Sequence, residues 1–335
     1  MFILFSLFCF FSSNAQLDFE FTEVASGFSN PVDIANDGFN VDRLYIVQQS
    51  GEIKLMKKNN GTWLVRLEDI DPPREKKGAS AHILKTLEAF GLHWDENILY
   101  QSNQSDYYLH IIEQLFEEHH CYYCQCTRAQ IKAIGGIYQG HCRHLKLDNN
   151  QRAIRVINQI HIDQYSDLIQ GKVECDKALA KEDFIIQRKD GLFAYQLAVV
   201  ADDIYQNISH VIRGCDLLEP TARQLSFYQL LTDKTFNQTF RSKQGENHYS
   251  EHVKAPVFGH IPLAVTEQGY KLSKQNKAPA IDNHMPQPAL FAALQFLGQQ
   301  PPSDLKHSCV DEIIQWAIAH WQLDSVPKKQ EIQLR

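Results

Sequence analysis

The sequence lacks an excess of positive charge, internal repeats and low-complexity tracts. It has 33 Lys and Arg residues against 40 Asp and Glu residues, which gives a formal net charge of −7 at pH 7. This balance argues against a generally basic nucleic-acid coat, although a local basic face would suffice for RNA binding. Without repeats, a solenoid or repeat array is not indicated.

The sequence also lacks a long apolar run at its start. Residues 2–11 (FILFSLFCFF) are apolar but fall short of the roughly 20 residues that a membrane-spanning helix needs. Together with the small residues that follow, residues 1–16 resemble a signal peptide with a cleavage site after Ala15, although no Lys or Arg precedes the run. We therefore expect no membrane partner.

What is present is typical of a soluble globular protein. The 335 residues, of which 44% are hydrophobic and 22% charged, suffice for two domains or for one domain with an insertion. Residues 17–62 contain short alternating runs separated by turn residues, which predicts a few antiparallel strands. From Trp63 onward, apolar strands alternate with amphipathic helices, which predicts a parallel α/β sheet. The expected strands are 63–71, 184–186 and 197–200, and the expected helices include 105–119, 288–297 and 309–321.

Cysteines are present and clustered. Four of the eight lie in one short segment, a distribution that favours a metal site over a disulfide framework. Zinc prefers four ligands in a tetrahedron, and by spacing these could be any four of Cys121, Cys124, Cys126, His141 and Cys142. A set of reduced thiols is the alternative. Buried reduced thiols are expected at the isolated positions, which are Cys175, Cys215 and Cys309.

Two further features suggest ligand chemistry. Residues 271–275 (KLSKQ) carry Lys271 and Lys274, which could clamp a polyphosphate or could be a solvated lysine pair. Glu68, Tyr195 and Arg213 stand near predicted strand ends, where α/β sheets bind their ligands. An arginine there suits a substrate carboxylate, and surface or capping roles are the alternative.

Seven segments, taken in order, resemble one family, the glutamyl-queuosine tRNA(Asp) synthetases, which are truncated relatives of glutamyl-tRNA synthetase. The resemblance covers about 63–321. The segments are 63–74 (WLVRLEDIDPPR), 123–128 (YCQCTR), 135–143 (GGIYQGHCR), 182–186 (EDFII), 190–200 (DGLFAYQLAVV), 213–221 (RGCDLLEPT) and 271–275 (KLSKQ).

The resemblance implies a class I aminoacyl-tRNA synthetase fold, with a Rossmann-like catalytic core and a zinc-binding insertion. It implies ATP-dependent activation of glutamate and transfer of glutamate to queuosine in tRNA(Asp). It also implies a cytoplasmic location, Mg²⁺ with the ATP, and a monomer. The implied roles are one structural zinc on Cys124, Cys126, Tyr138 and Cys142, glutamate contacts from Glu68, Tyr195 and Arg213, and ATP and pyrophosphate contacts from Lys274.

The sequence departs from the family at its start. Family members open with an Arg-Phe-Ala-Pro-Ser-Pro-like loop and a His-x-Gly-Ser-like turn that bind ATP. Here the first histidine is His82, and no arginine precedes Arg43. Residues 17–61 instead resemble the first blade of secreted propeller-type sugar dehydrogenases. Either a foreign segment replaces the family's first strand and nucleotide loop, which we favour, or the N-terminal segment folds into the vacancy.

The predicted organisation and the competing functions follow from these observations. A signal-peptide-like segment (1–16) and a foreign β-rich segment (17–62) precede the catalytic domain (63–322), which carries a zinc-binding insertion (121–145) and a surface insertion (232–257); a polar tail (323–335) follows. The first functional hypothesis is a glutamate ligase. The second is a catalytically inactive, zinc-containing tRNA-binding protein, and the third is a fragment of a secreted sugar oxidoreductase.

Overall fold

The computed structural model describes residues 64–73, 75–94, 96–150, 152–233, 236, 254–272 and 281–334, together with the backbone of 44–48 and 52–56. The predicted signal-peptide-like segment, most of the predicted β-rich segment and most of the surface insertion lie outside the described residues. Among the described helices, none combines the length and the apolar character that crossing a membrane requires.

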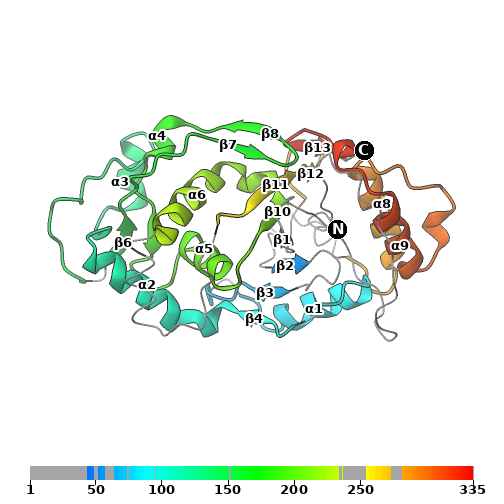
Figure 1. Cartoon of the computed structure of the whole chain (residues 1–335), viewed down its shortest axis with the longest axis horizontal. Coiled ribbons are helices and arrows are strands. Elements are labelled where there is room, and N and C mark those ends of the chain that lie inside the picture. The colour runs from blue at the N-terminus through cyan, green and yellow to red at the C-terminus, as the bar shows by residue number, and fades with distance from the viewer. Residues whose placement is uncertain are drawn as a thin grey trace.

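The centre of the molecule is a mixed eight-stranded sheet with the order β4-β3-β2-β1-β10-β11-β7-β8 (Figure 1). Its strands are β1 (Leu44–Gln48), β2 (Glu52–Met56), β3 (Val65–Leu67), β4 (Leu99–Tyr100), β7 (Gln164–Asp167), β8 (Gly171–Glu174), β10 (His210–Gly214) and β11 (Val257–Ile261). β1, β10, β11 and β7 are parallel neighbours, as are β3 and β4. The β1–β2, β2–β3 and β7–β8 pairs are antiparallel, so the expected parallel sheet is found only in part.

The hairpin formed by β1 and β2 lies inside this sheet. β1 pairs in parallel with β10, with Ile46 opposite Ile212, and β2 pairs with β3. The backbone of this segment therefore occupies the central position for which the sequence offered no family strand. This is the alternative that the sequence analysis disfavoured, because hairpin patterning differs from the expected strand–loop–helix unit.

Two smaller sheets flank the central one. β5 (Cys121–Cys124), β6 (Ala153–Val156) and β9 (Ile185–Gln187) form an antiparallel sheet that carries the cysteine segment. β12 (Leu263–Val265) pairs in parallel with β13 (Glu331–Gln333). Short helices α3 (Arg128–Ala133) and α4 (Lys177–Ala180) begin at Thr127 and Asp176, whose side-chain oxygens accept bonds from the first backbone N–H groups.

Among the described residues, six longer helices pack around the sheet. They are α1 (Ala79–Ala89), α2 (Ser105–Glu117), α5 (Tyr195–Tyr205), α6 (Leu218–Thr232), α8 (Pro286–Phe296) and α9 (Val310–His320). The helices predicted at 105–119, 288–297 and 309–321 are confirmed within a few residues. The predicted strand at 197–200 is wrong, because these residues lie in α5. This helix is buried along most of its length, and a short apolar run does not distinguish such a helix from a strand.

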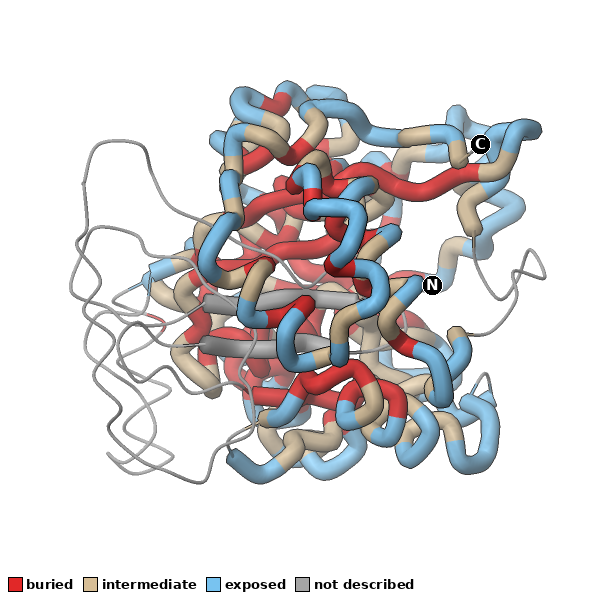
Figure 2. The backbone as a smooth tube through the Cα atoms, turned by 90° about the vertical axis from the view of Figure 1, so that its right-hand side faces the viewer, coloured by how far each residue is buried: buried red, intermediate tan, exposed pale blue. Residues whose placement is uncertain are grey.

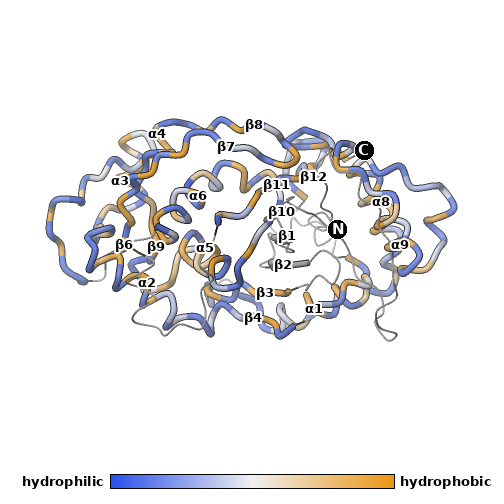
Figure 3. Tube along the Cα trace, in the orientation of Figure 1, coloured by the Kyte–Doolittle hydropathy of each residue, from blue (hydrophilic) through white to orange (hydrophobic). Residues whose placement is uncertain are grey.

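Two apolar clusters form most of the core. One packs α1, α8 and α9 together, and the other packs α2, α5 and α6. The buried segments run through the centre of the molecule with exposed turns around them (Figure 2), and apolar colour follows the same segments (Figure 3). Along α2, Ile112 and Leu115 are buried in the core, whereas Leu109 is 42% exposed.

Candidate active site

Three predicted residues for glutamate binding come from three elements. Glu68 directly follows β3, Tyr195 is the first residue of α5, and Arg213 lies in β10. They are electrostatic neighbours. Burial raises the pKa of Tyr195, and the charge of Glu68 raises it further. Burial also raises the pKa of Glu68 to about 7, although the charges of Arg66 and, more weakly, Arg213 oppose this shift. The structure therefore brings the three predicted residues together.

Each of these three side chains keeps a polar atom without a hydrogen-bond partner among the described residues. The atoms are Oε1 of Glu68, the hydroxyl of Tyr195 and Nη1 of Arg213, and all three are shielded from solvent. Buried polar atoms are normally satisfied, because an unpaired one costs about 1–3 kcal/mol. A cluster of an acceptor, a hydroxyl and a cationic donor in one neighbourhood indicates a site that is completed by a polar, charged ligand.

Arg213 is held by neutral groups. Its Nε donates to Nε2 of His260 at 3.0 Å, and its Nη2 donates to the side chains of Thr221 and Gln224, the latter at 2.6 Å. The guanidinium is completely buried and lies over the ring of Phe258, 4.9 Å from the centroid. Within the described part of the chain, no carboxylate forms an ion pair with it. Its positive charge is therefore available to an anionic ligand.

A second buried arginine, Arg66 in β3, is neutralised by contrast. Its Nη2 lies 2.6 Å from Asp203 and its Nε lies 3.7 Å from Asp202. Tyr108 and Tyr228 donate to these two carboxylates. Burial alone would lower the pKa of Arg66, but the two aspartates raise it above its ordinary value. This group is an internal ion network behind the candidate site.

The lysine motif is described only in part. Nζ of Lys271 lies 2.7 Å from Oδ2 of Asp216, close after Arg213 in the sequence. The start of the motif is thereby attached to the same end of β10 as Arg213. Ser273, Lys274 and Gln275 lie outside the described residues, so the ATP role of Lys274 stays a prediction.

The thiols of Cys124, Cys126 and Cys142 converge. Their sulfur atoms all lie within 4.8 Å of one another, and those of Cys126 and Cys142 are 3.5 Å apart. Two sulfurs on one tetrahedral zinc would be separated by about 3.8 Å, given Zn–S bonds of about 2.3 Å. The three predicted cysteine ligands therefore fit a zinc ion.

Tyr138 supplies the fourth predicted position. Its hydroxyl accepts a hydrogen bond from the backbone N–H of Cys142 at 2.8 Å and also interacts with Cys124. The ring is buried under the guanidinium of Arg155, 3.9 Å from its centroid. The predicted tyrosine thus stands beside the three thiols.

The two remaining spacing-based candidates do not join the thiol group. Successive side chains of a strand point to opposite faces. Along β5, the thiol of Cys124 faces the other two thiols, whereas Cys121 packs in the main core with Ile112. His141 is exposed, and within the described part of the chain its recorded contact is with the ring of Tyr138. Among the isolated cysteines, the expected burial is found for Cys215 but is wrong for Cys309, which is exposed at the start of α9.

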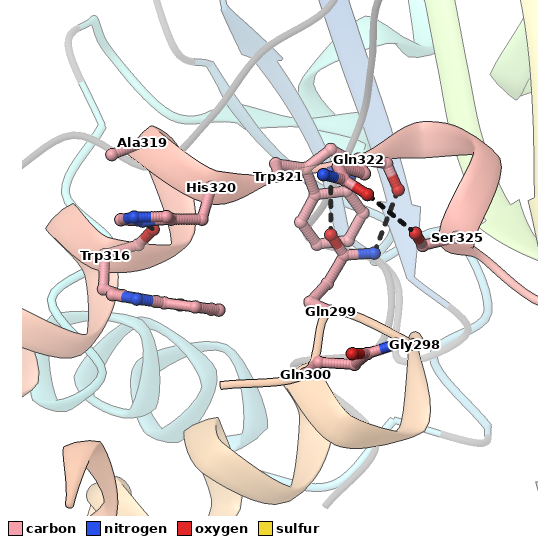
Figure 4. A pocket seen from close by; sticks show the side chains of 9 residues that line it. All are labelled: Gly298, Gln299, Gln300, Trp316, Ala319, His320, Trp321, Gln322 and Ser325. Carbon is pink, nitrogen blue, oxygen red and sulfur yellow. Dashed lines mark hydrogen bonds between the residues drawn. The ribbon is translucent and has the colours of Figure 1, made fainter. Parts of the chain in front are cut away.

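A cavity of about 380 Å³ lies elsewhere, between the ends of α8 and α9. Trp316 and His320 stack on one side of it, and the amide of Gln299 bonds to the backbone of Gln322 on the other (Figure 4). None of the predicted site residues lines it. This cavity therefore lies away from the candidate site, which is recognised by its unpaired charged groups.

Comparison with known proteins agrees with this geometry. The family described as tRNA synthetases class I (E and Q), catalytic domain, matches residues 52–250. A glutamyl-Q tRNA(Asp) synthetase from Colwellia psychrerythraea is 61% identical over 274 residues, which cover 82% of this chain and 82% of that protein. The chain belongs to this synthetase family. Another glutamyl-Q tRNA(Asp) synthetase, from Escherichia coli K12, is 45% identical over 283 residues, 84% of this chain and 85% of that protein.

Solved synthetases share the fold. A glutamate tRNA ligase from Elizabethkingia meningosepticum, in complex with its amino acid, superposes with a TM-score of 0.57 and 22% identity, covering 79% of this chain. A glutamate-tRNA synthetase from Elizabethkingia anophelis gives 0.58 and 22%, covering 81% of this chain. This chain spans 59% and 60% of the lengths of those two proteins. At this identity the likeness supports the class I synthetase fold.

Several structural residues of the site were not predicted. The sequence analysis named Arg213 but not the groups that hold it, namely Asp167, His260 and Gln224, nor the Arg66 network. One signal was present: His260 is a polar residue within the apolar strand run of β11, where a side chain needs a buried partner.

Proposed function

We propose that this chain activates glutamate with ATP and transfers it to queuosine in tRNA(Asp). Its family membership and the printed names of its similar relatives support the reaction class. The observation that carries the proposal is Arg213, which is fully buried, held by neutral acceptors and free at Nη1 among the described residues. A buried charge is costly unless it is paired, so this position selects a ligand carboxylate.

The charges of glutamate fit the three side chains. Of its two carboxylates, the α-carboxylate loses its charge when it becomes an adenylate, whereas the side-chain carboxylate keeps its charge throughout. We assign the side-chain carboxylate to Arg213 and the hydroxyl of Tyr195, and the α-ammonium to Glu68. Glutamine would leave Arg213 without an anion, which would favour glutamate.

The activation step is positioning and charge neutralisation. An oxygen of the α-carboxylate attacks the α-phosphorus of ATP, the bond from that phosphorus to the bridging oxygen of the β-phosphate breaks, and pyrophosphate leaves with the electron pair. Lys274 is proposed to contact ATP and to stabilise the departing charge. Mg²⁺ is proposed to accompany ATP. The glutamyl group then passes from the adenylate to queuosine, and AMP leaves.

The thiol group is proposed to hold one structural zinc on Cys124, Cys126, Tyr138 and Cys142. Bound zinc would fix the loop between β5 and β6. The surrounding bonds support this role: the backbone N–H of Tyr138 donates to Glu182 at 3.0 Å, and Arg223 of α6 donates to the same carboxylate. These two bonds connect the metal loop to the catalytic core.

The remaining predictions complete the proposal. We propose a cytoplasmic location, because ATP, tRNA and reduced thiols coexist in the cytoplasm. We also propose that the chain is a monomer, as the family resemblance implies. We also propose that residues 17–62 stand in place of the family's nucleotide loop. This replacement would weaken ATP binding, since the family's ATP-binding turn has no counterpart in the sequence.

Glutamate-dependent exchange of pyrophosphate into ATP tests activation, and transfer of labelled glutamate to tRNA(Asp) tests the second step. We expect exchange with glutamate, and transfer to tRNA(Asp) that carries queuosine but not to the same tRNA with unmodified guanosine. Binding of tRNA(Asp) without any exchange would overturn the proposal in favour of an inactive tRNA-binding protein.

A further inference from the structure

Behind Arg213 lies a chain of two more buried polar side chains. Nε of Arg213 is 3.0 Å from Nε2 of His260, and Nδ1 of His260 is 2.6 Å from Oδ2 of Asp167. The side chains of His260 and Asp167 are both fully shielded from solvent. The three residues come from the neighbouring parallel strands β10, β11 and β7, with Arg213 directly opposite His260. The strand register therefore sets their order.

The donors and acceptors of this chain fix the state of the imidazole. The Nε–H of an arginine can only donate, so Nε2 of His260 must accept. The Thr221 hydroxyl lies 3.1 Å from the same nitrogen, and it donates its own hydrogen to the carbonyl of Leu217 at 2.8 Å. Nδ1 then carries the hydrogen and donates to Asp167, which leaves His260 neutral. Burial and the charge of Arg213 hold the pKa of His260 below its usual value. Burial would raise the pKa of Asp167, but the His260 hydrogen bond holds it below its ordinary range.

Asp167 itself cannot turn freely. Its Oδ1 accepts from the backbone N–H groups of Ile169, Gln170 and His260 at 3.0, 2.8 and 3.1 Å. Only Oδ2 faces the imidazole. The carboxylate is therefore a fixed anchor, and the orientation of His260 is determined by the loop that follows β7.

We propose that Asp167 and His260 are positioning residues that aim Nη1 of Arg213 at the carboxylate of the amino-acid substrate. This inference rests on the proposed function and names two residues that the resemblance did not supply. His260 holds Nε, and Thr221, Gln224 and the carbonyl of Leu217 hold Nη2. Among the described residues, Nη1 is the nitrogen of Arg213 that has no partner and is left for the ligand.

A neutral histidine can orient Arg213 without neutralising its charge, which a carboxylate in direct contact could not do. If Asp167 contacted Arg213 directly, it would neutralise the guanidinium, as Asp203 does for Arg66. The imidazole is held by the fixed carboxylate of Asp167 and in turn orients Arg213. The negative charge of Asp167 stays separated from the guanidinium by the imidazole ring. The positive charge thus remains directed at the substrate, while the rotamer of Arg213 stays fixed.

The Asp167→Asn variant tests the tautomer argument. The three backbone N–H groups keep an amide oxygen at the Oδ1 position, so the new NH₂ group must face Nδ1 of His260. The imidazole then carries its hydrogen on Nε2, opposite the Nε–H of Arg213, and two donors meet. We expect the KM for glutamate in pyrophosphate exchange to rise about tenfold or more, the cost of one lost charge-assisted hydrogen bond. The KM for ATP should stay at its wild-type value.

A matched pair at the imidazole separates positioning from simple packing. In His260→Gln, the amide oxygen can reach the place of Nε2 and accept from Arg213. In His260→Leu, the volume is similar but no acceptor remains. We expect the glutamate KM to rise clearly more in His260→Leu than in His260→Gln. Equal glutamate KM values for these two variants would overturn the proposal, because packing alone would then explain them.

The tautomer can be read without any activity. Long-range ¹H–¹⁵N correlations of the ring, assigned by the signal that disappears in His260→Gln, should show a hydrogen on Nδ1 in the wild type and on Nε2 in Asp167→Asn. A wild-type Nε2–H tautomer overturns the inference. If the wild type shows no glutamate-dependent exchange, the proposed function fails and the inference with it. If exchange occurs and Asp167→Asn keeps the wild-type glutamate KM, only the inference fails.

Discussion

Arg66 and Arg213 are both completely buried, yet their surroundings differ. Arg66 lies 2.6 Å from Asp203 and 3.7 Å from Asp202, so its charge is compensated inside the protein. Arg213 contacts a histidine, a hydroxyl, an amide and a carbonyl, none of which carries a negative charge in the state derived above. The first is a structural ion network. We propose that the second is a site that a ligand completes.

The comparison shows that burial alone does not identify a functional arginine. Both residues lie in strands of the same sheet, and both would be read as core charges from their exposure. The two arginines differ in their partners. A carboxylate partner compensates the positive charge, whereas neutral partners leave the positive charge uncompensated. Both arginines act to lower the pKa of Glu68, Arg66 more strongly than Arg213.

The largest effect on stability is expected at Arg66. Arg66→Met would leave Asp202 and Asp203 buried without a cation, and breaking a buried pair in this way typically costs about 3–5 kcal/mol. We expect the free energy of unfolding in urea to fall by that amount. An unchanged unfolding midpoint would show that the network does not bear on stability.

At Arg213 we expect a large effect on activity and a smaller effect on stability. Arg213→Met removes a buried, uncompensated charge, which stabilises, but leaves the acceptors around Arg213 without their donor, which destabilises. The free energy of unfolding should therefore fall by less than in Arg66→Met. Activity should collapse: kcat/KM for glutamate in pyrophosphate exchange should fall about thirtyfold or more, since losing one partner of a buried charge pair costs about 2–5 kcal/mol. If Arg213→Met destabilised the fold as much as Arg66→Met, the two sites would not differ.

We expect the thiol group of Cys124, Cys126 and Cys142 to affect the stability of the fold and not the chemistry of the candidate site. Cys142→Ser should lower the zinc content, measured by atomic emission, and reduce the free energy of unfolding by about 1–3 kcal/mol. Cys121→Ser is the matched control, because its thiol packs in the main core away from the other three. It should retain the metal. Equal loss of zinc from both variants would contradict the ligand set.

The smallest effect is the pH dependence that Glu68 confers. Its pKa is raised to about 7, so the carboxylate that would bind the substrate ammonium forms as the pH rises through that value. We expect the KM for glutamate to fall by a little under tenfold between pH 6 and pH 8, as the ionised fraction rises from about one tenth to nine tenths.

Asp202 also has its pKa raised to about 7 by burial, so a control must separate the two groups. Glu68→Gln removes only the titration of Glu68. The pH dependence of the glutamate KM should therefore be absent in that variant. If it persists unchanged, the titrating group belongs to the Arg66 network.

The positions of the predicted site residues follow from the sequence more directly than the scaffold does. Glu68, Tyr195 and Arg213 are polar residues near predicted strand ends, and their side chains interact electrostatically in the structure, while their role in binding glutamate stays a prediction. The predicted strand at 197–200 is wrong, since residues 197–204 of α5 are all buried and a short apolar run does not distinguish a buried helix from a strand. The hairpin position of β1 and β2 was disfavoured, because sheet insertion depends on long-range pairing that local patterns do not encode.

The groups that hold Arg213 escaped prediction for the same reason. Asp167 and His260 are 93 residues apart, and only the parallel register of β7, β11 and β10 aligns them. In the thiol group, spacing allowed five candidates. The alternation of β5 removed Cys121, and the exposed position of His141 removed the other.

The most direct test of the unpaired Arg213 charge is pyrophosphate exchange by the wild-type protein with glutamate and with glutamine, which differ in the charge of the side chain. A buried arginine that awaits an anion predicts a kcat/KM for glutamate at least about a hundredfold above that for glutamine. Equal values for the two amino acids would contradict it, because Arg213 would then have no role in selecting a carboxylate.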